Sequence, residues 1–135
     1  MLRKLLLSAM IALPIYAEAK SILEPGETLQ AGRVLQSPNQ CFTLGFRDQG
    51  NLVLVNRSGK VLWTSGTFNT NASQLYLDFG GNLKLLNSAG SPINWTPRSK
   101  GDYAFLRLQN DGNLVIYSDA FAPLWYTGTY NSPCG

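Results

Sequence analysis

Apolar and polar residues alternate along short segments of the chain, and glycine-containing turns separate these segments. Residues 42–46 read Phe-Thr-Leu-Gly-Phe, and residues 104–108 read Ala-Phe-Leu-Arg-Leu. Because successive side chains of a strand point to opposite faces, such alternation over roughly four to eight residues predicts a half-buried β-strand. No useful stretch beyond the first 19 residues has the 3.6-residue period of an amphipathic helix. The pattern predicts an all-β protein.

The turn residues divide the chain into expected elements. Residues 21–36 contain Pro-Gly and Gly turn signals between apolar residues and predict two short strands. Residues 41–55 have two apolar runs on either side of a glycine and predict a hairpin. Residues 61–63 follow another glycine turn and predict a further short strand.

A repeated unit organises these strands. The tripeptide Gly-Asn-Leu occurs at positions 50–52, 81–83 and 112–114, a step of 31 residues each time. Each asparagine is followed, 12 or 13 residues later, by a tryptophan: Trp63, Trp95 or Trp125. The glycine of each copy marks an expected bulge or tight turn without room for a side chain.

One unit of this length cannot bury its own apolar face, whereas three units can share a core. We therefore expect a three-sided β-prism with pseudo-threefold symmetry, built from three subdomains of about four short antiparallel strands each. The three tryptophans are expected to meet near the symmetry axis. A propeller is the alternative, but three blades fall below its usual range of about four to eight.

The third repeat carries polar residues at a spacing of two. If residues 109–117 form one strand, alternate side chains stand in a single row: Gln109, Asp111, Asn113, Val115 and Tyr117. The row offers two amides, a carboxylate, a small apolar surface and a phenol. Closely spaced donors and acceptors beside an apolar patch suit a sugar, which has several hydroxyls and a face of C–H groups. The alternative is a half-buried strand with a polar outer face.

The equivalent rows of the other two repeats have changed. The first repeat holds Arg47, Gln49, Asn51, Val53 and Val55, and the second holds Asp78, Gly80, Asn82, Lys84 and Leu86. Both rows lack the carboxylate at the second position and the phenol at the last. We expect both to be retained scaffold that does not bind a sugar in the manner of the third repeat. The alternative is that Arg47 or Lys84 recognises an acidic sugar or a protein.

The composition argues against several classes of function. The chain has 135 residues, a formal net charge of +3 and no histidine, and its basic residues are scattered, which argues against a nucleic-acid partner. With two cysteines and no histidine, the usual ligands of zinc are missing, so we expect no metal and no cofactor. A glycosidase needs two carboxylates about 5–9 Å apart. Asp111 has no acidic neighbour in its row and Asp78 lies in another repeat, so we expect no enzyme activity.

Residues 1–19 have the three parts of a secretory signal peptide. Arg3 and Lys4 form a basic start, residues 5–16 are nearly all apolar, and residues 17–19 read Ala-Glu-Ala. The apolar run is shorter than the roughly 20 residues that span a bilayer. We expect a signal peptide over residues 1–19, then one secreted domain over residues 20–135 without stable membrane insertion, extracellular or periplasmic. An uncleaved anchor or an amphipathic helix is the alternative.

The two cysteines, Cys41 and Cys134, predict a disulfide if the protein is exported, because oxidising compartments preserve such bonds. The bond could form within one chain, tying the C-terminal tail to the first strand region, or between two chains through the tail. The sequence leaves both arrangements open.

Taken together, these features resemble the bulb-type, or monocot mannose-binding, lectins. The resemblance covers residues 22–129 and rests on the three repeats, their tryptophans, Gly-Glu-Thr-Leu at residues 26–29, and the motif Gln-x-Asp-x-Asn-x-Val-x-Tyr at residues 109–117. It implies a β-prism of three four-stranded subdomains that binds α-mannose or mannose-rich glycans without metal or catalysis.

The family motif also implies a role for each side chain of the third row. By analogy, Asp111 and Asn113 would bind the axial 2-hydroxyl of mannose, Gln109 the 3-hydroxyl and Tyr117 the 4-hydroxyl. Val115 would pack on the carbon face of the sugar. An equatorial 2-hydroxyl would leave polar partners unpaired, at about 1–3 kcal/mol each, which favours mannose over glucose.

The family further implies an exchange of C-terminal strands between subunits, which would give a homodimer here through residues 124–130. A lectin-like bacteriocin or toxin, or a protein-interaction module that uses the same fold for targeting, is the alternative function.

Overall fold

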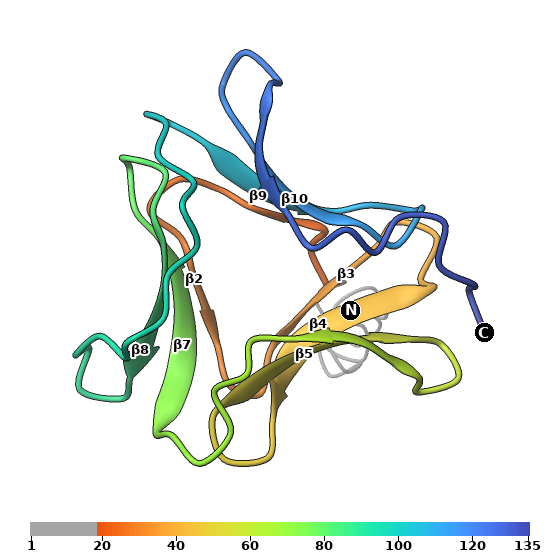
Figure 1. Cartoon of the computed structure of the whole chain (residues 1–135), viewed down its shortest axis with the longest axis horizontal. Coiled ribbons are helices and arrows are strands. Elements are labelled where there is room, and N and C mark those ends of the chain that lie inside the picture. Colours follow the sequence, from red (N-terminus) through yellow and green to blue (C-terminus); the bar gives the residue numbers. More distant parts are fainter. Residues whose placement is uncertain (1–18) are drawn as a thin grey trace, which may run out of the picture.

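Three antiparallel sheets form the sides of a triangular prism (Figure 1). The structure is a computed structural model that describes residues 19–135, and this part of the chain contains eleven strands and no helix. The predicted β-prism is therefore confirmed. The predicted signal peptide, apart from Ala19, lies outside the described residues.

The segment before the first repeat contributes one strand to each sheet. It contains β1 (Ile22–Leu23), β2 (Thr28–Gln30) and β3 (Val34–Gln36). β1 pairs with β9, β2 with β7 and β3 with β4, so this segment ties the three repeats together. The expectation of two strands here is wrong, because two turns divide the segment into three parts and each part reaches the edge of a different sheet.

The first and third repeats have the expected four-stranded sheets. The order in the first is β3-β4-β5-β6, with β4 (Phe42–Arg47), β5 (Asn51–Asn56) and β6 (Val61–Thr64). The order in the third is β1-β9-β10-β11, with β9 (Phe105–Leu108), β10 (Leu114–Tyr117) and β11 (Pro123–Tyr126). The predicted hairpin over residues 41–55 and the strand at residues 61–63 are confirmed.

The second repeat has only three strands, in the order β2-β7-β8, where four were expected. Its hairpin consists of β7 (Ala72–Leu77) and β8 (Leu83–Asn87), and the chain that follows makes a single bridge between Leu86 and Pro92. The tryptophan of this repeat is one residue further from its asparagine than in the other repeats. Trp95 nevertheless packs on Trp63. The chain before it therefore accommodates one additional residue, and this segment does not pair regularly with β8. The Trp95 N–H turns back to the Ile93 carbonyl at 2.7 Å, in a three-residue γ-turn.

Equivalent apolar side chains of the three repeats form one core. Leucines or isoleucine at matching positions are at most 1% exposed: Leu44, Leu75 and Leu106; Leu52, Leu83 and Leu114; Leu54, Leu85 and Ile116. The tryptophans meet as expected, with the ring centroid of Trp63 6.3 Å from that of Trp95 and 5.9 Å from that of Trp125, both edge to face.

The glycine of each Gly-Asn-Leu copy lies in a tight turn, as predicted. Gly50, Gly81 and Gly112 have φ angles of +90°, +84° and +93°. A Cβ atom would lie 2.5 Å from the Thr70 carbonyl oxygen at Gly50 and 2.9 Å from the Thr129 carbonyl oxygen at Gly112. These positions therefore need both the left-handed conformation and the absence of a side chain.

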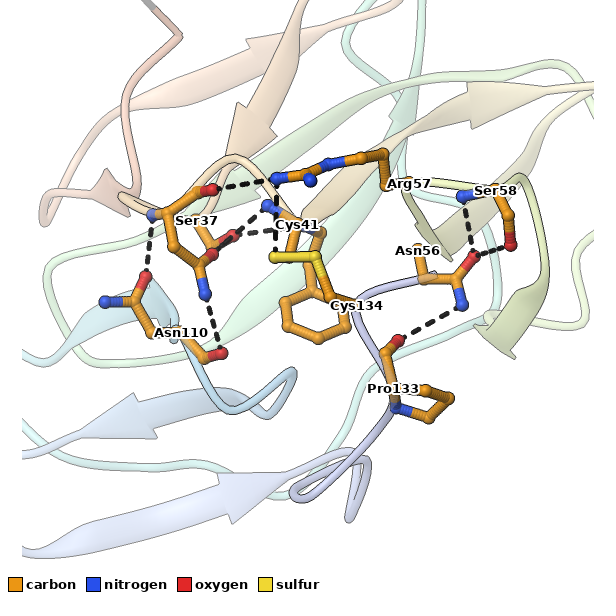
Figure 2. Close-up of a disulfide and its surroundings, with 10 residues drawn as sticks. Ser37, Cys41, Asn56, Arg57, Ser58, Asn110, Pro133 and Cys134 are labelled. Carbon is orange, nitrogen blue, oxygen red and sulfur yellow. Dashed lines mark hydrogen bonds between the residues drawn. A yellow bond between two sulfur atoms is a disulfide. The ribbon is translucent and has the colours of Figure 1, made fainter.

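The disulfide forms within one chain, between Cys41 and Cys134, and ties the C-terminal tail to the start of the first repeat (Figure 2). Next to it, Asn56 Nδ2 donates to the Pro133 carbonyl at 3.1 Å, and the Arg57 N–H donates to the Cys134 carbonyl at 2.9 Å. β11 pairs with β10 of its own chain. The exchange of residues 124–130 stays a prediction, and this intrachain bond would have to open or re-form between chains for the tail to leave.

Candidate functional site

All five predicted site residues of the third repeat lie on the β9–β10 hairpin, but they do not form one strand. The chain turns between Leu108 and Leu114, with the Gln109 N–H donating to the Asn113 carbonyl at 2.9 Å. The expectation of a single strand over residues 109–117 is wrong, because the positive φ of Gly112 reverses the chain. Gln109 and Asn113 consequently face each other across the turn, and only Val115 and Tyr117 belong to β10.

The turn nevertheless brings the polar side chains together. The Tyr117 hydroxyl donates to Gln109 Oε1. Gln109 Nε2 contacts the two carboxylate oxygens of Asp111 at 3.3 and 3.4 Å, and Asp111 Oδ1 accepts from the Asn113 N–H at 2.9 Å. The phenol, amide and carboxylate thus form one continuous hydrogen-bonded chain.

Asn113 has a structural role that its place in the polar row does not predict. Its Oδ1 accepts from the backbone N–H groups of Gly128 at 3.0 Å and Thr129 at 3.2 Å, and the residue is only 8% exposed. Its Nδ2 makes no hydrogen bond to another group within residues 19–135, so that donor remains for a ligand. The sequence carries a signal for this role, because Thr-Gly-Thr at residues 127–129 matches Ser-Gly-Thr at residues 65–67. Asn51 Oδ1 likewise accepts from the Thr67 N–H at 3.2 Å.

Val115 stands on the outer face of the sheet but is only 2% exposed. Its cross-strand partners are Arg107 on β9 and Tyr126 on β11, so their side chains stand beside it on the same face. The Tyr117–Gln109 hydrogen bond joins the two ends of this face. Arg107 and Tyr126 were missed in the sequence because only the pairing register of three strands brings them to Val115.

Three aromatic rings lie together at the Tyr117 end of the site. The Phe105 ring centroid is 5.7 Å from that of Tyr117, at an interplanar angle of 30°. It is also 5.7 Å from that of Phe121, at 76°. Phe121 lies in the turn between β10 and β11 and is 70% exposed. This cluster was not foreseen, because the residues belong to three separate parts of the hairpins.

The C-terminal tail supports the turn that carries the site. The Ser132 N–H donates to the Asp111 carbonyl at 3.3 Å. From the first repeat, the Asn39 N–H donates to Asn110 Oδ1 at 2.8 Å. Asn39 also binds the Cys41 N–H through its Oδ1 at 3.1 Å. The disulfide region therefore contacts the site turn on two sides.

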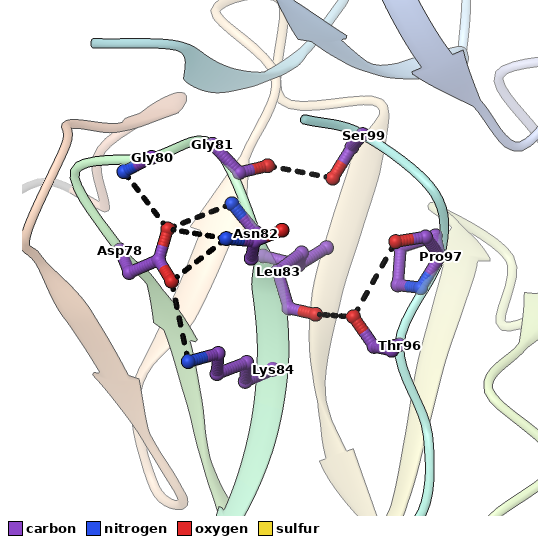
Figure 3. A network of polar contacts seen from close by, with 9 residues as sticks. All are labelled: Asp78, Gly80, Gly81, Asn82, Leu83, Lys84, Thr96, Pro97 and Ser99. Carbon is purple, nitrogen blue, oxygen red and sulfur yellow. Dashed lines mark hydrogen bonds and ion pairs between the residues drawn. The ribbon is translucent and has the colours of Figure 1, made fainter. Parts of the chain in front are cut away.

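In the row of the second repeat, the polar side chains bind one another and the backbone of their own hairpin (Figure 3). Asp78 accepts from the backbone N–H of Asn82 at 2.8 Å and of Gly80 at 3.0 Å, and Lys84 Nζ lies 3.2 Å from Asp78 Oδ2. Partial burial raises the pKa of Asp78, but the hydrogen bonds from Asn82 and the Lys84 ammonium outweigh it, so the net pKa is lowered. This carboxylate is held by its own hairpin.

A hollow of about 700 Å³ opens beside this row, where the fourth strand is missing. Its lining includes Tyr76, Lys84 and Trp95.

The row of the first repeat differs in another way. Arg47 and Gln49 are exposed at the hairpin turn, whereas Val53 and Val55 are 5% and 8% exposed. Asn51 keeps its structural bond to Thr67. The row thus presents a cation and an amide at the turn, without a carboxylate or a phenol.

The two acidic residues weighed as a catalytic pair lie on different sheets, Asp111 on the β9–β10 hairpin and Asp78 on the β7–β8 hairpin. Within residues 19–135, no group of three or more His, Cys, Asp or Glu side chains could hold a metal ion. The same part of the chain has no helix long and apolar enough to cross a membrane.

Comparison with known proteins gives one curated relative of high similarity. Plumieribetin, a B-type lectin of Scorpaena plumieri, is 32% identical over 100 residues, which cover 73% of this chain and 87% of that protein. No protein-family model matches the chain.

Solved structures give further matches. A Marasmius oreades lectin is 28% identical, with a TM-score of 0.75 over 86% of this chain and 97% of that one. A monomeric mannose-binding lectin of Gastrodia elata is 29% identical, with a TM-score of 0.71 over 82% and 99%. The mannose-specific agglutinin of snowdrop, Galanthus nivalis, in complex with methyl α-D-mannoside, is 32% identical, with a TM-score of 0.64 over 82% and 98%.

Proposed function

The chain belongs to the bulb-type lectin family, and on this basis we propose that it binds α-D-mannose or mannose-containing glycans through the third repeat, without metal or catalysis. The snowdrop relative, which is a mannose-specific agglutinin, supports the choice of sugar. The hydrogen-bonded chain of Tyr117, Gln109 and Asp111 carries the proposal for the site.

The polar atoms of this chain match what a sugar hydroxyl needs. Asp111 supplies an acceptor, and Asn113 Nδ2 supplies a donor that no group within residues 19–135 uses. A hydroxyl that donates to the carboxylate and accepts from the amide would satisfy both. Neither of the other rows has this pair, because Gln49 and Gly80 replace the carboxylate.

Binding requires a rearrangement of the outer face. The Tyr117 hydroxyl and Gln109 Oε1 hydrogen-bond to each other and not to a ligand. Val115 is also buried among the side chains around it. A sugar would replace this bond with its own hydroxyls and uncover Val115 for contact with its carbon face. Because the exchanged hydrogen bonds nearly cancel in free energy, the net gain is small.

The expected affinity is on the order of millimolar, about −4 kcal/mol, because few groups contact one sugar. Clustered glycans or several protein copies would raise the effective affinity. A homodimer formed by strand exchange through residues 124–130 is one way to supply several copies.

We infer that the protein is exported to an extracellular or periplasmic space. The predicted signal peptide and the disulfide between Cys41 and Cys134 support this, since oxidising compartments preserve such bonds.

Titration with methyl α-D-mannoside, followed by amide NMR resonances, tests the function. We expect saturable shifts at Asn113 and Tyr117, and smaller or no shifts with methyl α-D-glucoside, whose 2-hydroxyl is equatorial. Asn51 and Asn82 provide internal controls from the other two repeats. An absence of saturable shifts at the third repeat would contradict the proposal.

A further inference from the structure

The turn after β10 has a residue that does not suit its backbone. The same turn follows the second hairpin strand in each repeat, and its left-handed position holds Gly59, Gly90 and Phe121, at φ angles of +88°, +84° and +65°. The backbone hydrogen bond is also the same. Each of these N–H groups donates at 2.9 Å to the carbonyl three residues earlier.

Neither the turn nor the core explains this phenylalanine. Glycine adopts the left-handed conformation without steric penalty, whereas a bulky side chain there is strained. Phe121 is 70% exposed, so burial of its ring offsets little of that strain. A strained, exposed side chain at a position where both sister repeats have glycine points to a role in binding.

The ring of Phe121 is continuous with the mannose site. It packs edge to face on Phe105, and Phe105 in turn packs on Tyr117. The turn that presents it is fixed, because Ser118 Oγ accepts from the N–H groups of Ala120 at 3.2 Å and Ala122 at 3.0 Å. The ring therefore has a defined position at the Tyr117 end of the site.

We propose that Phe121 and Phe105 form a subsite that binds the second sugar residue of a mannose-terminated glycan. The inference rests on the proposed function. The C–H face of a pyranose is apolar, and contact with an exposed ring removes apolar surface of both partners from water. The terminal mannose occupies the polar row, and the residue joined to it lies against the aromatic rings.

Two other exposed phenylalanines lack this relationship. Phe79 pairs with Tyr103 and covers Gly26 in the second repeat, and Phe68 lies in the turn after β6. Neither is in the repeat with the intact polar row. Phe68 therefore provides a matched control, since it is 55% exposed.

The test compares methyl α-D-mannoside with the α1-2-, α1-3- and α1-6-linked mannobioses in NMR titrations of the parent, Phe121→Gly and Phe68→Ala. Phe121→Gly restores the turn residue of the sister repeats, so we expect it to fold at least as stably as the parent. In the parent, at least one mannobiose is expected to bind about three- to tenfold more tightly than the monosaccharide, the range expected of one aromatic contact. Phe121→Gly should lose this preference and keep its affinity for the monosaccharide, and Phe68→Ala should keep both.

Two results would overturn the subsite alone: a parent that prefers no mannobiose, or a preference that survives in Phe121→Gly. A parent that does not bind methyl α-D-mannoside would overturn the proposed function and the subsite together. The monosaccharide titration thus separates the two failures.

Discussion

The side-chain carbonyl of Asn113 accepts a hydrogen bond from the backbone N–H of Gly128, 15 residues further along the chain, at 3.0 Å. This bond joins the site turn to the end of the last strand. Asn113 also accepts from the Thr129 N–H, and Asn51 accepts in the same way from the equivalent Thr67 N–H in the first repeat, where the other polar residues of the row have changed. The asparagine of the repeat is therefore part of the scaffold, and the Asn113 Nδ2 has no hydrogen-bond partner within residues 19–135.

The Asn113 side chain is expected to stabilise the fold. Asn113→Ala leaves the N–H groups of Gly128 and Thr129 without their partner, and we expect the free energy of unfolding to fall by about 1–3 kcal/mol in urea denaturation. Asn51→Ala should lose a similar amount of stability and keep mannoside binding. Unchanged stability of Asn113→Ala would contradict the structural role.

Asp111→Asn separates binding from folding. The new side chain keeps an oxygen that can accept from the Asn113 N–H, and residue 111 is exposed, so the free energy of unfolding should change by less than about 0.5 kcal/mol. Loss of the charged acceptor should reduce affinity for methyl α-D-mannoside at least tenfold, by about 1.4 kcal/mol or more. If the variant unfolds instead, the row has a structural role only. Asp119→Asn, at an exposed turn residue, is the control.

Two glycines with nearly equal φ angles distinguish backbone strain from steric contact. Gly50 and Gly59 have φ of +90° and +88°, but a Cβ at Gly50 would lie 2.5 Å from the Thr70 carbonyl oxygen, whereas one at Gly59 meets nothing within 4 Å. Gly59→Ala should lower the free energy of unfolding by about 1–2 kcal/mol through strain alone. Gly50→Ala should lower it clearly further. If both variants lose the same free energy of unfolding, the backbone at Thr70 moves away from the new Cβ atom at no cost.

The disulfide is expected to stabilise both the fold and the site. It closes a separation of 93 residues, and its loss should lower the free energy of unfolding by about 2–4 kcal/mol. Because Ser132 in the tail binds the Asp111 carbonyl, Cys134→Ser should also weaken mannoside binding. Denaturation and titration of Cys134→Ser and of the Cys41→Ser/Cys134→Ser double variant measure both effects. Mass spectrometry of the parent with and without reductant checks that the bond is present and intrachain.

The lowered pKa of Asp78 leads us to expect that the free energy of unfolding decreases in acid. Hydrogen bonds from Asn82 and the Lys84 ammonium outweigh burial and lower its pKa in the folded protein below the usual 3.8. The unfolded chain therefore binds the proton more readily, so this stabilisation is present above pH 3.8 and is lost as the pH falls through the folded-state pKa.

Urea denaturation between about pH 5 and pH 2 tests this, and stability should fall less steeply in Asp78→Asn than in the parent. Glu27 has a pKa lowered by Lys20 and the Glu24 N–H, so Glu27→Gln should show a comparable, independent effect. If the free energy of unfolding decreases equally with pH in the parent and in Asp78→Asn, Asp78 does not contribute to the loss of stability in acid.

The outline of the fold and the members of the polar row could be predicted because their signals are local. Alternation of apolar residues predicted the β4–β5 hairpin, and the step of 31 residues predicted the prism with Trp63, Trp95 and Trp125 in contact. The Gly-Asn-Leu copies predicted glycine turns without room for a side chain. Each of these depends on residues close together in sequence, or on repetition of the same unit.

The remaining features depend on pairing and register, which arise only when the strands assemble into sheets. Gly112 reverses the chain within the segment interpreted as one strand, and the chain before Trp95, one residue longer than in the other repeats, adds no fourth strand to the second sheet. Cross-strand neighbours bury Val115, and the fold brings Cys41 to Cys134. The class of fold and the repeat that keeps the polar row can thus be predicted from the order of residues alone. The closed arrangement of that row and the place of Phe121 beside it came from the packing of strands, because side chains distant in sequence meet only when the sheets form.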